Sequence, residues 1–150
     1  MVSAGDLHFT IHAAGRLTVE RPVELDGEAY RGWTQLDQRC FCPFPVTFEQ
    51  AVRDFKQRAR MICEPDGSLV LSGESGQRPW RIEGTLFDRD GRLWCVELWG
   101  RCPGSAVQPL LAALGWPQVQ LVFQLVRAGV YLGEEEFRRY AGWQPSVPTK

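Results

Sequence analysis

Three Asp-Gly pairs constrain the fold of this chain more than any other feature of its sequence. Each pair lies between two short runs in which apolar and polar residues alternate, as expected for strands with one buried face. Asp-Gly suits a two-residue turn whose central residues both take positive φ, so between alternating runs it is the strongest short-range signal for a β-hairpin. The three pairs are Asp26-Gly27, Asp66-Gly67 and Asp90-Gly91.

The alternating runs predict four hairpins in all. One of them has no Asp-Gly pair: at the N-terminus, Leu7, Phe9 and Ile11 share a face, and residues 16–20 alternate again after Gly15. The other three predicted hairpins pair residues 23–25 with 28–30, residues 61–63 with 69–71, and residues 80–87 with 92–99.

The clearest helix signal begins at Thr47. Thr47 and Gln50 form a capping box, in which each side chain satisfies a backbone N–H that the first helical turn leaves free. Residues 59–63 also alternate like a strand, so we expect the helix to cover about 47–60. Its apolar stripe, at spacings of four and three residues, consists of Phe48, Val52, Phe55, Ala59 and Ile62.

Two shorter helices are predicted nearer the C-terminus. Ser105 and Gln108 form a second possible capping box, although Pro109 would also allow a start at Gln108. Three acids at 134–136 precede two arginines, an order that suits the helix dipole, so residues 134–140 are predicted to be helical. Between these helices, residues 118–126 alternate and predict a strand, with a buried helix as the alternative.

Together these elements predict an α+β fold. We expect an antiparallel, hairpin-rich curved sheet, one main packing helix at about 47–60 and two short C-terminal helices. A length of 150 residues is typical of one domain, so residues 1–150 are predicted to form a single domain. Residues 143–150 are expected to form a loose tail.

Charge and hydropathy argue against several classes of function. The net charge is −1, which gives no support for a general electrostatic grip on nucleic acid. No apolar run reaches the roughly 18 residues of a membrane span, and the N-terminus does not resemble a secretory signal. A soluble cytoplasmic protein with reduced thiols is therefore expected. No cofactor-binding motif is present, so no cofactor is predicted.

The five cysteines are candidate metal ligands, because thiolates bind Zn²⁺ well. One tight pair and three scattered single residues are far from the usual arrangement of two close pairs, and small buried hydrophobes are the alternative interpretation. The two histidines, His8 and His12, are separated by roughly 13 Å on a straight strand and cannot share one ion. The candidate ligands are Cys40, Cys42, Cys63, Cys95 and Cys102.

Carboxylates around the third hairpin are the candidate catalytic groups. Asp88, Asp90 and Glu97 could hold Mg²⁺ for hydrolysis. Their order along a hydrophobic strand resembles the core of PD-(D/E)XK nucleases. That family has Lys two residues after the Glu, whereas this chain has Trp99, so the residue that helps to activate water is missing. Asp at a hairpin turn also has a local explanation, because its side chain caps backbone N–H groups.

Aromatic residues support the leading functional hypothesis. Trp94 and Trp99 are an odd number of residues apart, so a regular strand would place them on opposite faces. The outer one could stack with Arg81 or Arg92. We therefore predict a non-catalytic binding or protein-interaction module with a protein partner or a small ligand. The alternatives are a small metal-dependent hydrolase and a homodimeric structural subunit.

Overall fold

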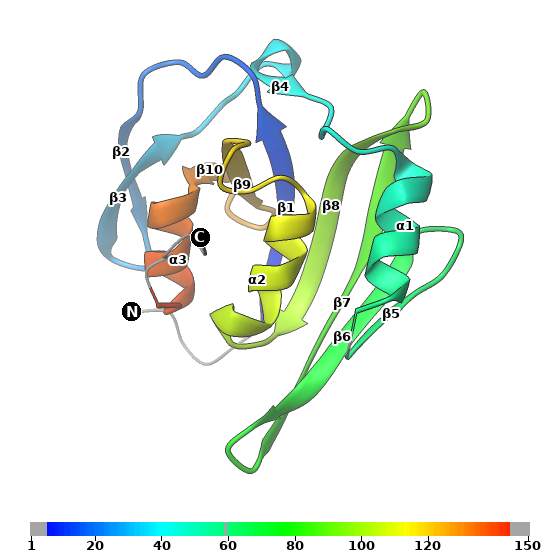
Figure 1. The fold of residues 1–150 in the computed structure, drawn as a ribbon. Helices are drawn as coiled ribbons and strands as arrows, with labels where there is room; N and C mark the ends of the chain where they lie inside the picture. Colours follow the sequence, from blue (N-terminus) through cyan, green and yellow to red (C-terminus); the bar gives the residue numbers. More distant parts are fainter. Residues whose placement is uncertain (1–5, 59, 145–150) are drawn as a thin grey trace.

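The computed structural model describes residues 6–58 and 60–144, and it confirms the predicted α+β class (Figure 1). The described residues form one antiparallel sheet, three α-helices and a short 3₁₀ helix. The helices are α1 (Phe48–Lys56), α2 (Gly104–Ala113) and α3 (Glu134–Ala141), and the 3₁₀ helix is η1 (Gln38–Cys40). The strands are β1 (Leu7–Ala14), β2 (Arg21–Leu25), β3 (Glu28–Trp33), β4 (Phe41–Cys42), β5 (Met61–Cys63), β6 (Ser68–Ser75), β7 (Arg78–Arg89), β8 (Arg92–Arg101), β9 (Leu121–Leu125) and β10 (Val130–Gly133).

The first strand of the chain lies at the centre of the sheet. The strand order is β2-β3-β10-β9-β1-β8-β7-β6-β5, and β4 pairs with the end of β1. The three hairpins predicted from Asp-Gly are confirmed as β2–β3, β5–β6 and β7–β8. Asp26 and Asp90 indeed take positive φ at their turns.

The predicted N-terminal hairpin is wrong. Residues 15–20 form no strand, and β1 pairs instead with β8 and β9, whose residues come much later in the chain. Alternation around Gly15 correctly marks a strand but does not identify its partner. β1 has the regular alternation of a strand with one face in the core, and the long β8 offers it a better-matched apolar face than residues 16–20 could.

The main helix is confirmed together with its cap. Thr47 Oγ1 accepts a hydrogen bond from the Gln50 backbone N–H, and the Gln50 side chain accepts one from the Thr47 N–H. α1 ends at Lys56, so Ile62 is not part of its stripe but an exposed residue of β5. Ala59 lies outside the described residues.

The C-terminal elements agree with prediction except for one cap and for strand β10, which the sequence did not predict. Residues 121–125 form strand β9, and α3 covers the predicted helix. The second capping box is wrong: the residue before the first turn of α2 is Pro103, no side chain caps the helix, and Ser105 already lies within it. The chain therefore enters α2 earlier than the Ser-x-x-Gln spacing suggests.

All three helices cover one face of the sheet and enclose the core (Figure 1). α1 contributes Phe55, α3 contributes Phe137, and the two central strands contribute Phe9 and Phe123, each almost fully buried. Trp143 is also buried, and its ring packs against Phe9 and Phe137. The expected loose tail is therefore wrong at Trp143, while residues 145–150 lie outside the described part of the chain.

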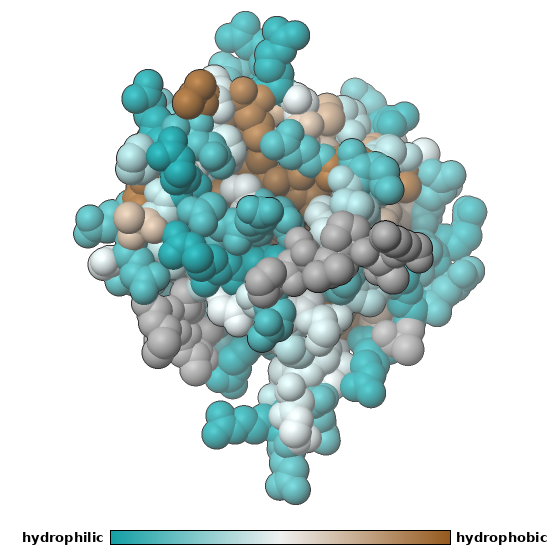
Figure 2. Space-filling view, turned by 60° about the vertical axis from the view of Figure 1, so that its left-hand side comes forward, coloured by the Kyte–Doolittle hydropathy of each residue, from teal (hydrophilic) through white to brown (hydrophobic). Residues whose placement is uncertain are grey.

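One face of the surface can be followed in a space-filling view (Figure 2). Figure 2 shows a face on which hydrophilic residues predominate and hydrophobic residues gather in the upper half. Within the described ranges, no helix has both the length and the apolar character needed to cross a membrane.

Candidate functional site

The face of the sheet opposite the helices carries the most distinctive side chains of the molecule. We call it the helix-free face. Strand register places its residues in rows that run across the sheet, because directly paired residues point to the same side. One row consists of Ile62, Val70, Glu83, Trp99 and His8, from β5 to β1. The next row consists of Ser68, Thr85, Glu97, Thr10, Gln124 and Tyr131.

Exposed apolar side chains gather on the helix-free face. Ile62 is 62% exposed, Phe87 42%, Trp99 39% and Val126 37%, and these are four of the five large exposed hydrophobic residues in the described ranges. Val126 follows β9 beside β1, since its N–H donates to the His8 carbonyl (3.1 Å). Single exposed apolar residues are ordinary, but a concentration on one face is typical of an interaction surface.

A half-buried hydrogen-bond network lies in the middle of this face. His8 Nε2 and Glu97 Oε2 are 2.6 Å apart, and both side chains are about 30% exposed (30% and 29%). Thr10 Oγ1 donates to Gln124 Oε1 (3.3 Å) and lies 2.8 Å from His12 Nε2. Because the only proton of the Thr10 hydroxyl goes to Gln124, His12 Nε2 must be the donor to Thr10.

His12 is held neutral by its surroundings. The Phe41 ring stacks on the imidazole with centroids 4.6 Å apart, and burial lowers the His12 pKa from 6.5 to about 4. With the proton on Nε2, the buried Nδ1 is an acceptor, and it has no hydrogen-bond partner among the described residues. The position next to Phe41 therefore favours a structural, uncharged imidazole.

Cys95 lies directly opposite His12 in the β1–β8 pair, so the fold places a thiol beside an imidazole. Burial, with the Glu97 carboxylate adding to it, raises the Cys95 pKa to about 11. Proton transfer from a thiol of pKa 11 to an imidazole of pKa 4 is strongly unfavourable, because each pKa unit corresponds to about 1.4 kcal/mol. The pair therefore lacks the activated thiolate that cysteine catalysis requires.

The structure does not bring the cysteines together as metal ligands. None of the five is disulfide-bonded in the described part of the chain, where Cys40, Cys63 and Cys102 are buried. Burial raises the pKa of Cys63 to about 11 and of Cys102 to about 12, which opposes the thiolate form that binds metal. Among the described residues no group of three or more potential ligands is arranged to hold an ion, so the structure gives no support to the predicted set, which also included Cys42 and Cys95.

The candidate catalytic carboxylates are likewise apart. Asp88 accepts a hydrogen bond from the Gly91 backbone N–H in the β7–β8 turn, and Asp90 has a left-handed φ of 54° in the same turn. Glu97 lies on the helix-free face opposite Thr85, and four residue pairs of the β7–β8 ladder, from Leu86–Val96 to Arg89–Arg92, separate it from the turn. Turn chemistry accounts for both aspartates, and no shared magnesium site forms.

A β-bulge corrects the expectation that Trp94 and Trp99 lie on opposite faces. Cys95 pairs with Phe87 and Leu93 with Asp88, which leaves Trp94 as an extra residue in β8. The extra residue resets the alternation, so Trp94 lies on the helix-free face with Trp99. The Arg89 guanidinium lies 3.8 Å from the centroid of the Trp94 ring.

The two predicted arginines have other partners. Arg81 forms an exposed ion pair with Glu83 (3.2 Å) on the helix-free face, one row away from Trp99. Arg92 donates to the Phe44 carbonyl (3.2 Å) at the opposite end of β8 and so supports the segment that leads into α1. Sequence reasoning placed Trp99 and Arg81 on one surface, but Arg92 is not part of a patch around Trp99.

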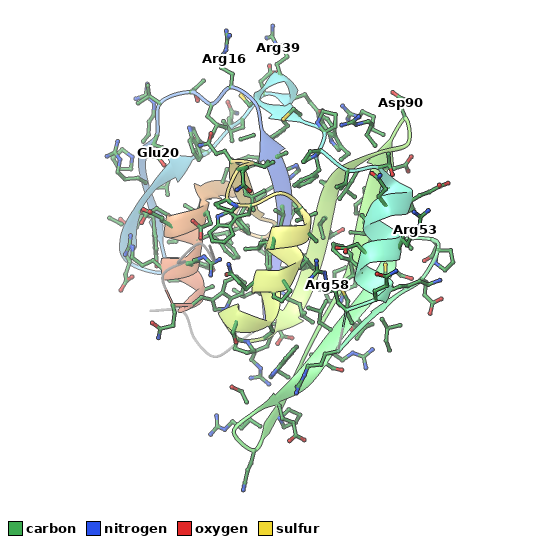
Figure 3. All side chains as sticks on the ribbon, in the orientation of Figure 1. Arg16, Glu20, Arg39, Arg53, Arg58 and Asp90 are labelled. Carbon is green, nitrogen blue, oxygen red and sulfur yellow. The ribbon has the colours of Figure 1, made fainter. Side chains whose placement is uncertain are left out.

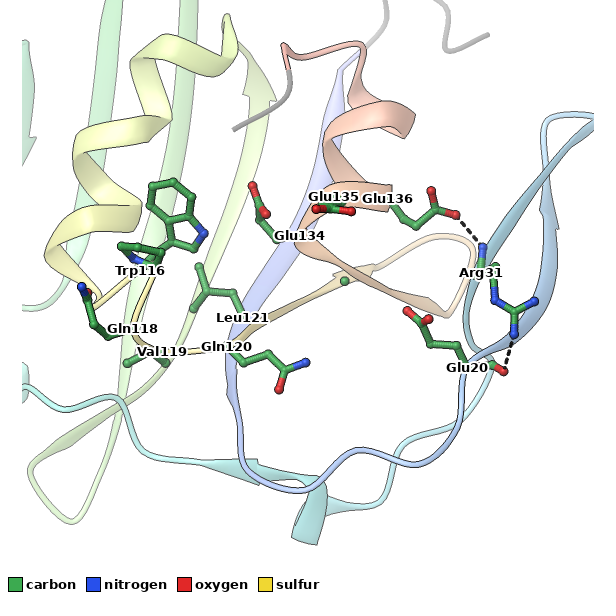
Figure 4. A pocket seen from close by; sticks show the side chains of 12 residues that line it. Glu20, Arg31, Trp116, Gln118, Val119, Gln120, Leu121, Glu134, Glu135 and Glu136 are labelled. Carbon is green, nitrogen blue, oxygen red and sulfur yellow. Dashed lines mark hydrogen bonds between the residues drawn. The ribbon is translucent and has the colours of Figure 1, made fainter. Parts of the chain in front are cut away.

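A cavity of about 580 Å³ lies beside the first turn of α3 (Figure 4). Two of its four acidic residues have local roles: Glu134 pairs with the buried Arg138, and Glu136 accepts a hydrogen bond from the Arg31 backbone N–H (2.6 Å). Acids are also favourable at the N-terminus of any helix. The other side chains labelled in Figure 4 are Glu20, Trp116, Gln118, Val119, Gln120, Leu121 and Glu135.

Comparison of the chain with family models, with curated proteins and with solved structures finds no match. The case for function therefore depends on the geometry alone. The network of His8, Thr10, His12 and Gln124 was missed from sequence because its members come from both ends of the chain. The regular alternation of polar residues in β1 predicted which residues share its polar face, but it did not predict which strands lie beside it.

Proposed function

We propose that this chain is a non-catalytic protein-interaction module and that the helix-free face is its contact surface. The observation that carries this proposal is the concentration of exposed apolar side chains there, represented by Trp99, Phe87, Ile62 and Val126. Aromatic residues are enriched at protein interfaces because they bury a large area with few rotatable bonds.

The polar groups of the same face support recognition rather than chemistry. His8 and Glu97 are bonded to each other, and Thr10 and Gln124 are bonded to each other. Cys95 favours the neutral thiol and His12 the neutral imidazole, so neither provides a nucleophile or a base near neutral pH. A hydrogen-bonded centre flanked by apolar residues has the mixed character of a protein contact.

A protein fits this surface better than a small ligand. The row from Ile62 to His8, with Trp99 in it, crosses five strands, which at roughly 4.8 Å between neighbours spans about 19 Å. Small ligands bind in concave sites that enclose most of their surface, whereas an extended row of side chains on a sheet suits a broad contact.

The test compares a double variant, Trp99→Asp with Phe87→Asp, with the wild type and a Val19→Asp control. Val19 is 81% exposed but lies outside the helix-free face, in the segment between β1 and β2. Each purified protein is immobilised on a resin and incubated with extract from the cells that produce it. The proteins that bind are then quantified by mass spectrometry. Proteins retained by wild type and control but lost from the double variant would support the proposal.

Equal retention by all three proteins would contradict it. A second pair of changes, Ile62→Asp with Val126→Asp, repeats the test on the two sides of Trp99, since Ile62 begins the row on β5 and Val126 lies beyond its other end, next to His8. Light scattering on the purified wild type and double variant shows whether the partner is a second copy of this chain.

A further inference from the structure

A second cavity, independent of the helix-free face, lies on the core side of the sheet where α1 ends and α2 begins. Its volume is about 420 Å³, within the range of roughly 300–1,000 Å³ that is usual for small-molecule sites. The lining residues come from the segment that follows α1, from strands β5, β6 and β7, and from the first two turns of α2. They are Gln57, Arg58, Arg60, Met61, Leu71, Trp80, Ser105, Ala106 and Pro109.

The inner wall of this cavity is apolar. Met61 and Leu71 belong to the buried core, and the half-buried Trp80 packs against that core. Gly73 pairs with Trp80 across β6 and β7, and a methyl group at Gly73 would lie 2.6 Å from Cζ2 of the indole. The absence of a side chain at Gly73 therefore lets the Trp80 ring lie close against the β6 backbone, beside the cavity.

The mouth of the cavity is cationic. Arg58 and Arg60 contribute two guanidinium groups, and no lining residue carries a carboxylate. Asp54 accepts hydrogen bonds from Nε and Nη2 of Arg58 (3.2 and 3.0 Å), so it holds that side chain in place and offsets its charge, and the positive charge of the mouth comes mainly from Arg60. Arg60 forms no ion pair within the described residues, and its Nη1 would lie 2.8 Å from a methyl group at Gly73, beside Trp80.

We propose that this cavity binds a small amphipathic anion, with an apolar body against Met61, Leu71 and Trp80 and a carboxylate at Arg58 and Arg60. The planar guanidinium group pairs with carboxylate through two parallel hydrogen bonds, which gives direction as well as charge. Apolar walls below a cationic mouth select against simple inorganic anions and against cations of the same shape.

The first experiment titrates purified wild-type protein with octanoate by isothermal titration calorimetry. Octyltrimethylammonium has a similar apolar body with the opposite charge, and inorganic phosphate has the charge without the body. We expect octanoate to bind and the other two probes to give no measurable heat. Lack of octanoate binding, or equal binding of either control compound, would overturn the proposal.

Variants then assign the binding to this cavity. Arg60→Gln removes a charge that has no described ion pair, and Ala106→Trp fills the cavity from α2. Each variant should weaken octanoate binding at least about tenfold, because the first removes a charged hydrogen bond and the second removes the space for the ligand. Arg53→Gln is the matched control, because Arg53 belongs to α1 but points away from α2, whereas Arg58 lies between the two helices (Figure 3).

Unchanged octanoate binding in both Arg60→Gln and Ala106→Trp would show that the probe binds elsewhere and would overturn the assignment. A circular dichroism melt of each variant checks that the fold is kept. If Ala106→Trp does not fold, a second test compares Arg60→Glu alone with Arg60→Glu combined with Ser105→Arg. The single variant should abolish octanoate binding, because it reverses the charge at the mouth. The double variant should restore part of the binding, because it adds a guanidinium group at position 105. The outcome is separate from that of the protein-interaction test, since the two surfaces share no residue.

Discussion

The indole Nε1–H of Trp143 donates a hydrogen bond to the backbone carbonyl of Cys102 over 3.2 Å. The same side chain lies against Gly104, where a methyl group would come within 2.8 Å of the Trp143 Cβ. Trp143 follows α3, and Gly104 is the first residue of α2. This contact therefore joins the beginning of one helix to the end of the other.

We expect Trp143→Ala to lower the free energy of unfolding by about 3–5 kcal/mol, as is usual for a large aromatic residue removed from a core. Trp143→Phe keeps part of the ring contact with Phe137 and loses only the hydrogen bond and some volume, so its loss should be clearly smaller. Urea unfolding followed by circular dichroism measures both. Equal stability of Trp143→Ala and wild type would show that this residue does not anchor the helices.

The two predicted capping boxes can be distinguished by alanine substitution. Thr47→Ala removes a side chain that accepts a hydrogen bond from the Gln50 N–H (3.1 Å), and it should cost about 1 kcal/mol. Ser105→Ala is the matched control, because Ser105 lies inside α2 and caps nothing, and its effect should be near zero. Thermal unfolding of both variants checks this difference, and a larger loss for Ser105→Ala would contradict the position of the α2 cap.

His12 should make stability depend on pH. Its pKa is 6.5 when unfolded and about 4 in the fold, so between these values the unfolded chain binds more protons. Stability contributed by the neutral imidazole is therefore complete above pH 6.5 and is lost as pH falls through 4, by about 3 kcal/mol in total.

The measurement is the free energy of unfolding by urea across this pH window. The difference in free energy of unfolding between wild type and His12→Gln should narrow as pH falls. In His8→Gln, which keeps His12, the free energy of unfolding should depend on pH as steeply as in the wild type. Parallel pH profiles for wild type and His12→Gln would show that His12 titrates normally in the folded protein.

Cys95 should be a slow nucleophile. Its pKa of about 11, compared with 9.0 for an unperturbed thiol, implies about a hundredfold less thiolate near pH 8. Alkylation by iodoacetamide, followed by peptide mass spectrometry, should therefore be at least about a hundredfold slower for Cys95 in the native protein than in the denatured chain. Faster labelling in the native state would indicate an activated thiol and would reopen a catalytic role for the His12–Cys95 pair.

Local signals predicted much of the fold. Asp90-Gly91 defines a hairpin through its own backbone preferences, and Thr47 defines a helix start through hydrogen bonds within one turn, so neither depends on distant residues. The partner of β1 could not be predicted in this way, because several alternating strands offer similar apolar faces and only packing of the whole sheet selects among them. The single extra residue at Trp94 likewise leaves no clear mark in the sequence.

The candidate site was less predictable than the fold. Strand alternation predicted that Trp94 and Trp99 take opposite faces but did not say which of them is outside, and the structure has Trp99 39% exposed. The hydrogen bond between His8 and Glu97, the pairing of His12 with Cys95, and the cavity that Arg60 and Trp80 both line all depend on strand pairing or on a helix end meeting a sheet. Such neighbours come from the register of the strands, which composition and spacing do not specify.

The central position of β1 has a consequence for how the chain acquires its structure. During synthesis the first strand leaves the ribosome long before β8 and β9, which begin at Arg92 and Leu121, so it must wait without either neighbour. Pairings between such distant parts of a chain slow folding, because loop closure must precede the contacts that reward it. We therefore expect the Asp-Gly hairpins to form early. The pairing of β1 with β8 on one side and with β9 on the other, which completes the sheet, should be the slow and late step.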